Sequence, residues 1–147
     1  NRYQKAISEH GGVVDIANGE KVATKAGCLS CHRVGENGIA VGPDLVSLHS
    51  KPLEAILTDV LDPNRMVNRE SMALSVTTLD GNLYTGIIKE DGNTTLTLDL
   101  PGGVSQTIHR GRIDTVKPLG MSLMPTGLEN MVSPKEMKDL IAYLRQF

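Results

Sequence analysis

Apolar side chains recur at helical spacing in three stretches of the chain. We expect helices there, over about 14–26 and 53–61 and from residue 133 to the C-terminus, and a short helix over 2–10 that Gly11-Gly12 would stop. The C-terminal helix opens on Ser133-Pro134-Lys135-Glu136, which combines a capping box with proline at the first helical position. Both ends of the chain are therefore predicted to be helical.

The period of the pattern changes between residues 72 and 117. Short runs rich in Val, Ile, Thr and Leu are separated there by turn signals such as Asp80-Gly81-Asn82 and Pro101-Gly102-Gly103. This pattern predicts a five-stranded antiparallel meander. Its strands are expected at about 72–79, 83–89, 94–100, 104–109 and 113–117.

The length of 147 residues suits a single domain over 1–147 that carries an insertion over 72–117. Aromatic side chains are scarce, with no Trp, one Phe and three Tyr. The net charge of −2 is spread evenly, so no basic footprint for nucleic acid and no membrane-surface patch is visible. We expect no transmembrane segment, because no apolar run is long enough to cross a bilayer.

The stretch that carries chemistry is Cys28-Leu29-Ser30-Cys31-His32. A C-x-x-C-H run is the covalent attachment site of a c-type haem. Two residues on a tight turn let the thiols of Cys28 and Cys31 reach the two haem vinyl groups. His32 is then placed to supply the proximal nitrogen to the iron. The spacing predicts one covalently bound haem c, with its iron held by His32.

Zinc sites and redox dithiols also use C-x-x-C. A structural zinc site needs four ligands, and the chain has two cysteines and no H-x-x-x-H pair. A redox dithiol would lie between a strand and a helix of a βαβ unit, whereas the pattern before Cys28 is helical. Haem attachment is therefore the favoured interpretation.

A Gly42-Pro43-Asp44-Leu45 loop follows the motif. Pro43 lacks a backbone N–H but keeps its carbonyl, and its ring stiffens the loop. That carbonyl is a suitable acceptor for the outer ring N–H of His32, a bond that sets the orientation and basicity of an imidazole ligand. An ordinary loop proline is the alternative.

A second iron ligand is predicted at Met124. Met124 precedes Pro125, so its backbone is pushed out of the helical region and its thioether can be aimed at the iron. A thioether opposite an imidazole raises the reduction potential and fills the site that oxygen would otherwise take. Alternatively, the Met124 side chain could pack in the hydrophobic core. The other candidates are Met121, His49, His109, Met66 and an open site.

Together these features resemble a class I c-type cytochrome over residues 14–71 and 118–147. The resemblance implies an α+β chain, in which a mainly α-helical class I cytochrome c fold holds an inserted antiparallel sheet of about five strands. One departure is Ala23, where such cytochromes usually carry an aromatic residue that packs on the terminal helix.

Because strands precede the loop that holds Met124, the chain resembles the planctomycete/verrucomicrobial-type haem-binding domain more closely than an ordinary class I cytochrome. That family is typically found at the C-terminus of large extracytoplasmic, dehydrogenase-like proteins. The residues that match its motif are Cys28, Cys31, His32, Arg33, Gly42-Pro43-Asp44-Leu45, Asp62-Pro63-Asn64, Asp80-Gly81 with Gly86, Ser122-Leu123-Met124-Pro125 and Leu140-Ile141-Ala142-Tyr143-Leu144.

The function expected from motif and resemblance is single-electron transfer by an iron with His/Met ligation, and not catalysis. The expected compartment is the periplasm or another extracytoplasmic space of a bacterium, where such haems are attached. Expected partners are a redox protein or a fused or associated dehydrogenase, and a homo-oligomer could form through the insertion. The alternative is a five-coordinate or Met-labile haem domain that senses or reacts with NO, CO or peroxide.

Overall fold

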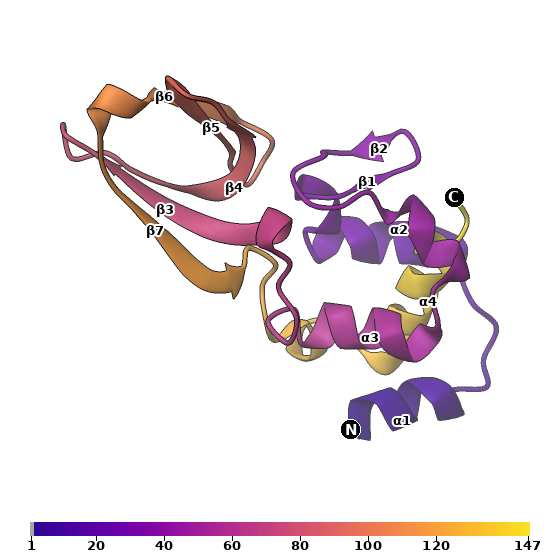
Figure 1. Cartoon of the computed structure of the whole chain (residues 1–147). Helices are drawn as coiled ribbons and strands as arrows, with labels where there is room; N and C mark the ends of the chain where they lie inside the picture. The colour runs from indigo at the N-terminus through magenta and orange to yellow at the C-terminus, as the bar shows by residue number, and fades with distance from the viewer. Residues whose placement is uncertain (1) are drawn as a thin grey trace.

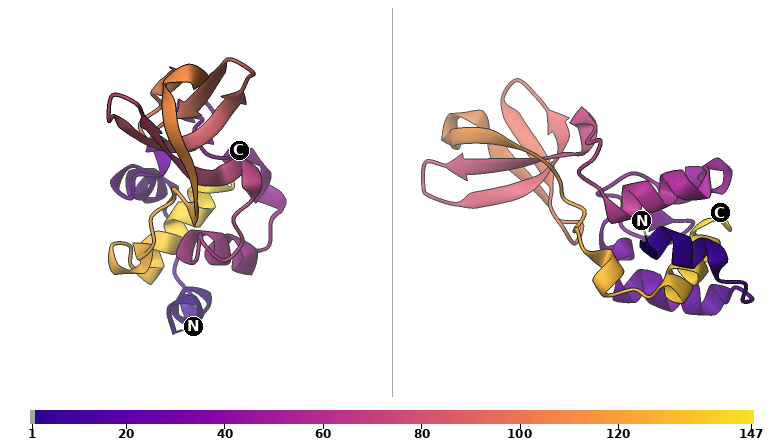
Figure 2. Two further views of the ribbon diagram at one scale, coloured as in Figure 1. Left: turned by 60° about the vertical axis from the view of Figure 1, so that its left-hand side comes forward. Right: turned by 90° about the horizontal axis from the view of Figure 1, so that it is seen from below.

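In the computed structural model, which describes residues 2–147, the helices gather in one lobe and the long strands in another beside it (Figures 1 and 2). Each lobe has its own cluster of buried apolar side chains. The bounds of the helices are α1 Arg2–Glu9, α2 Ile16–Lys25, α3 Leu53–Leu61 and α4 Pro134–Leu144.

The ends of the helices follow the predicted signals. Gly27 has φ 75°, a left-handed conformation that suits glycine and ends α2 just before the first cysteine. The capping box of α4 is formed as predicted, because the Ser133 hydroxyl accepts from the Glu136 amide while the Glu136 carboxylate accepts from the Ser133 amide. No helix among residues 2–147 has the length and apolar character needed to cross a membrane.

Helices α2 and α4 cross at a glycine, and this contact organises the helical lobe. A Cβ at Gly19 would overlap the backbone carbonyl of Asp139 and would lie 2.7 Å from the Cβ of Tyr143. Ala23 on the same helix is fully buried. The small residues Gly19 and Ala23 of α2 therefore allow a close contact with α4.

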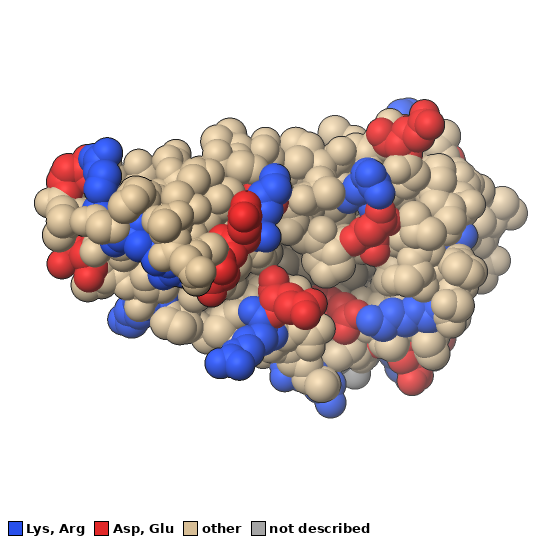
Figure 3. Space-filling view, turned by 45° about the horizontal axis from the view of Figure 1, so that its top comes forward, with Lys and Arg blue, Asp and Glu red and all other residues tan. Residues whose placement is uncertain are grey.

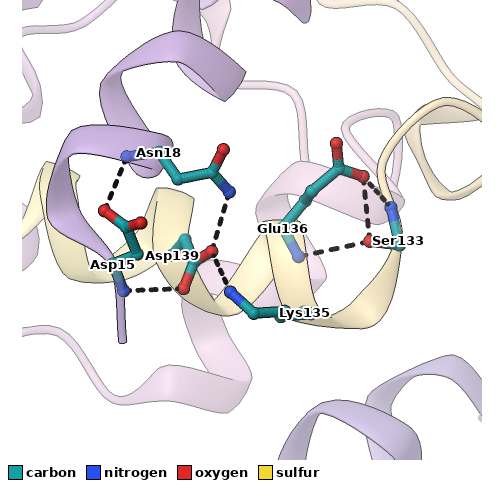
Figure 4. A network of polar contacts seen from close by, with 6 residues as sticks. All are labelled: Asp15, Asn18, Ser133, Lys135, Glu136 and Asp139. Atoms are coloured by element: carbon teal, nitrogen blue, oxygen red, sulfur yellow. Dashed lines mark hydrogen bonds and ion pairs between the residues drawn. The ribbon is translucent and has the colours of Figure 1, made fainter. Parts of the chain in front are cut away.

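A buried carboxylate joins the same two helices (Figure 4). Asp139 of α4 is 1% exposed and accepts from the Asp15 amide at 2.9 Å, the Asn18 side-chain amide at 2.8 Å and Lys135 Nζ at 2.8 Å. Asp15 is itself the N-cap of α2 and accepts from the Asn18 amide. Burial alone would raise the pKa of Asp139, but these hydrogen bonds outweigh it and lower the pKa.

Replacing Gly19 by alanine is expected to lower the free energy of unfolding by about 3 kcal/mol, because α2 and α4 would have to separate. Intrinsic helix propensity acts in the opposite direction by about 1 kcal/mol. Chemical denaturation of the haem-loaded protein measures the difference. Gly11→Ala is the matched control, because a Cβ there meets nothing within 4 Å. A Gly19→Ala variant as stable as the parent would contradict the close crossing.

Helix α1 also packs on the helical lobe. Ile7 is buried in the helical core, and the Tyr3 hydroxyl donates to the Val132 carbonyl. Burial, together with the negative charges of Glu129 and Glu136, raises the pKa of Tyr3 to about 12.

The second lobe is a five-stranded antiparallel sheet in the order β6-β5-β4-β3-β7. The strands are β3 Met72–Thr78, β4 Leu83–Asp91, β5 Thr95–Asp99, β6 Ser105–His109 and β7 Ile113–Ser122. The sheet has its own core of Leu74, Val76, Leu96, Leu98 and Ile108.

The predicted meander is wrong for the last strand. The first four strands follow one another across the sheet, but β7 pairs with β3 at the opposite edge from β6. β7 also extends to Ser122, beyond the predicted end at residue 117, because it runs beside β3 until Ser122 lies opposite Met72. The strands therefore leave and rejoin the helical lobe at one place.

Candidate functional site

The C-x-x-C-H segment forms a tight turn directly after α2. A short 3-10 helix covers Cys28–Ser30, and the Cys28 carbonyl accepts from the Cys31 amide at 3.3 Å and the His32 amide at 2.8 Å. Both cysteines are free thiols and half-buried. Burial raises the pKa of the Cys28 thiol, so the neutral thiol is favoured there. The turn keeps both sulfurs and the imidazole in one compact segment.

The orientation of His32 is set by the loop that follows. Its Nδ1 lies 2.7 Å from the Pro43 carbonyl oxygen, so Nδ1 carries the proton and Nε2 is left as the nitrogen that can bind a metal. Gly42 allows this approach, because a Cβ there would lie 2.8 Å from Cε1 of His32. The structure thus brings His32 and Pro43 together as the sequence predicted.

An ion pair holds the two sides of that loop. Arg33 Nε and Nη2 lie 3.1 and 3.0 Å from Asp44 Oδ2, while Asp44 Oδ1 accepts from the Val46 amide. The bond from the Val46 amide, and then that from Arg33, lower the pKa of the Asp44 carboxyl. Since both side chains are well exposed, the pair orients the neighbouring Pro43 more than it stabilises the fold.

Met124 lies on an irregular loop after β7 and is half-buried. Its amide donates to the Ser122 hydroxyl at 3.1 Å, and the Ser122 amide donates to Asn64 Oδ1 at 2.9 Å. The start of the Met124 loop is therefore fastened to the segment that follows α3. Sequence reasoning assigned no role to Asn64, although a side-chain amide after Pro63 is a common partner for a nearby backbone group.

The other candidate ligands lie in different settings. Met66 is 85% exposed, and Met121 is an exposed residue of β7. His49 is exposed and has its Nδ1 2.8 Å from the Val46 carbonyl oxygen. His109 ends β6 and accepts from the Gly111 amide through Nδ1.

The helical lobe carries apolar side chains that are not fully buried. Those that pack on the helical core and remain half-exposed include Cys28, Leu29, Leu45, Leu48, Leu53, Val60 and Leu61. A haem bound here would remove part of this apolar area from water. Two thiols can add to the haem vinyl groups, while the Nε2 of His32 and the half-buried thioether of Met124 are donors that suit haem iron. The residues present therefore fit a covalently bound haem.

The C-x-x-C-H turn and the contact between His32 and Pro43 have the geometry that covalent haem attachment requires. Residues 16–76 match the family model described as Cytochrome c, which supports a c-type cytochrome. The matched segment holds α2, the C-x-x-C-H turn, Pro43 and α3, and it ends within β3. A search of the curated proteins found no match. The family binds haem c covalently, and haem c with its iron is accordingly the cofactor.

Proposed function

We propose that the chain is an electron-transfer c-type cytochrome with one haem c whose iron is held by His32 and Met124. The observation that carries the proposal is the contact of 2.7 Å between His32 Nδ1 and the Pro43 carbonyl oxygen, which leaves Nε2 for the iron. The match of residues 16–76 to cytochrome c points to the same haem-based electron transfer.

Each residue of the site has a separate task in this proposal. When bound, the haem supplies an iron that gains and loses one electron. Cys28 and Cys31 tether it through two thioethers, so it stays on the protein. The Pro43 carbonyl keeps the His32 ring in one orientation, with Nε2 left for the iron. The thioether of Met124 fills the remaining position and favours the reduced state.

The proposal extends to the setting of the domain. We place it in the periplasm or another extracytoplasmic space of a bacterium, because c-type haems are attached there. The sheet before the Met124 loop supports the planctomycete/verrucomicrobial-type variety, whose partners are fused or associated dehydrogenases. Lys and Arg are interspersed with Asp and Glu on the face in Figure 3, so we expect weak electrostatic steering of any redox partner.

An optical spectrum of the purified holoprotein, ferric and ferrous, with and without CO, tests the proposal. We expect a low-spin ferrous spectrum that CO leaves unchanged, because two protein ligands occupy the iron. A high-spin ferrous form that binds CO at once would contradict a His/Met carrier. That outcome would favour the alternative of a five-coordinate or Met-labile domain for NO, CO or peroxide.

A further inference from the structure

A turn of the sheet lobe contacts the haem-attachment segment. The turn joins β5 to β6 and faces the helical lobe near β1 (Arg33–Val34) and β2 (Asn37–Gly38) (Figure 1). The Gly102 amide donates at 3.3 Å to the carbonyl of Ser30, which lies between the two haem-binding cysteines. Gly103 lies against the side chain of Ile39, where a Cβ would overlap Cγ2 and lie 3.2 Å from Cδ1.

The turn has a defined shape that is fixed by the sheet. The Leu100 amide donates to the Val104 carbonyl at 2.8 Å, and the Gly103 amide donates to the Leu100 carbonyl at 3.1 Å. Gly102 and Gly103 both have positive φ, 87° and 83°. Leu100 packs on the core of the sheet. Movement of the turn would therefore require movement of β5 and β6.

The surface that receives the turn leads directly to the iron ligand. The Ile39 amide donates to the Leu29 carbonyl at 3.1 Å, and the Val41 amide donates to the Cys31 carbonyl at 3.0 Å. The next residue, Gly42, lies against the His32 ring. Ile39 thus belongs to a short loop that is bonded to the motif on one side and supports His32 on the other.

We propose that the turn 100–104 of the inserted sheet is a positioning element of the haem site. It donates a hydrogen bond to the peptide between the two cysteines and contacts the loop 38–42 that supports His32. By covering part of Ile39, which is still 38% exposed, it lowers the polarity beside the haem site and favours the reduced iron, because a less polar surrounding disfavours the additional positive charge of the ferric state. This inference rests on the proposed function and gives the sheet a part in it.

The test compares two glycines with positive φ, one inside the turn and one outside it. Gly103→Ala places a methyl group against Ile39, whereas a Cβ at Gly81, between β3 and β4, meets nothing within 4 Å. Both positions have positive φ, 83° and 84°, so the backbone strain of an alanine is similar. We expect Gly103→Ala to shift the reduction equilibrium about threefold towards ferric iron, which is about 28 mV at 59 mV per tenfold. Gly81→Ala should leave the potential unchanged.

Ile39→Ala supplies a second variant that does not depend on a clash. Alone it should lower the potential through lost cover. In the Ile39→Ala background, Gly103→Ala should have little further effect, because the methyl group no longer meets a side chain. Amide hydrogen exchange at Val41 should accelerate in Gly103→Ala and not in Gly81→Ala.

The outcomes separate this inference from the proposed function. Equal potentials and equal Val41 exchange in Gly103→Ala, Gly81→Ala and the parent, each with a normal six-coordinate spectrum, would overturn the role of the turn and leave the carrier intact. An independent effect of Gly103→Ala in the Ile39→Ala background would also overturn it. A parent protein without a six-coordinate haem would refute the carrier itself.

Discussion

Met124→Ala is expected to open one axial position of the iron and to lower the reduction potential on the order of 0.1 V, within the ~0.8 V span set by axial ligands. A thioether favours ferrous iron over ferric iron, and its loss removes that preference. The ferrous variant should also bind CO, which the parent should not. The ferric thioether-to-iron charge-transfer band should disappear.

Met121→Ala is the matched control for this prediction. Met121 lies three residues earlier and is an exposed residue of β7, so its loss should leave potential, spectrum and CO binding as in the parent. Met66→Ala serves as a second control, because the Met66 side chain is 85% exposed. If Met121→Ala abolished the charge-transfer band while Met124→Ala retained it, the sixth ligand would have to be reassigned.

Local signals predicted the helices and the tight turn of the C-x-x-C-H segment well. Caps, helix periodicity and the C-x-x-C-H spacing each depend on residues within about one turn of one another. The contact between His32 and Pro43 spans only 11 residues and lies within one loop, so the sequence could suggest it. The resemblance to c-type cytochromes agreed with the family match over 16–76.

Contacts between distant segments were beyond sequence reasoning. Alternation of apolar residues locates strands but does not choose their partners, so β7 was placed beside β6 when it pairs with β3. Gly19 in a helix looks like a weak helix former, and only the structure shows the carbonyl of Asp139 against it. The contact of Gly103 with Ile39 likewise joins residues of different lobes.

These distant contacts also relate the sheet to the haem site. Met72 lies opposite Ser122, so the two chain connections of the sheet lie together. Ser122 is bonded to Asn64 and supports the Met124 loop, while the turn 100–104 reaches Ser30 on the side of the cysteines. The sheet therefore contacts both segments that supply the proposed iron ligands, which a separate appended domain would not do.

Asp139→Asn is expected to cost roughly 3 kcal/mol of unfolding free energy at pH 7. The carboxylate accepts three hydrogen bonds while 1% exposed. The amide that replaces one oxygen would place a donor against Asn18 and Lys135 or against the Asp15 amide. The junction of α2 and α4 would then hold unpaired polar groups. Chemical denaturation of the haem-loaded protein measures the loss.

The pH dependence of this loss of unfolding free energy follows from the charge of Asp139. The pKa of Asp139 is lowered in the folded protein, so its stabilisation is complete above the ordinary aspartate pKa of about 3.9 and is lost as the pH falls through the folded value. The difference between parent and Asp139→Asn should therefore be constant from pH 7 to about pH 5 and shrink below about pH 4. A difference that stayed constant down to pH 2 would show that shape, and not charge, causes the loss.

Asp59→Asn is the control that separates the effect of burial from the effect of losing an ion pair. Asp59 also pairs with a lysine, Lys51, but its side chain is 58% exposed. An exposed ion pair contributes about 1 kcal/mol or less and is screened by salt. We therefore expect a small, salt-dependent loss for Asp59→Asn and a large loss for Asp139→Asn that salt changes little. Equal losses would mean that the buried carboxylate does not hold α2 and α4 together.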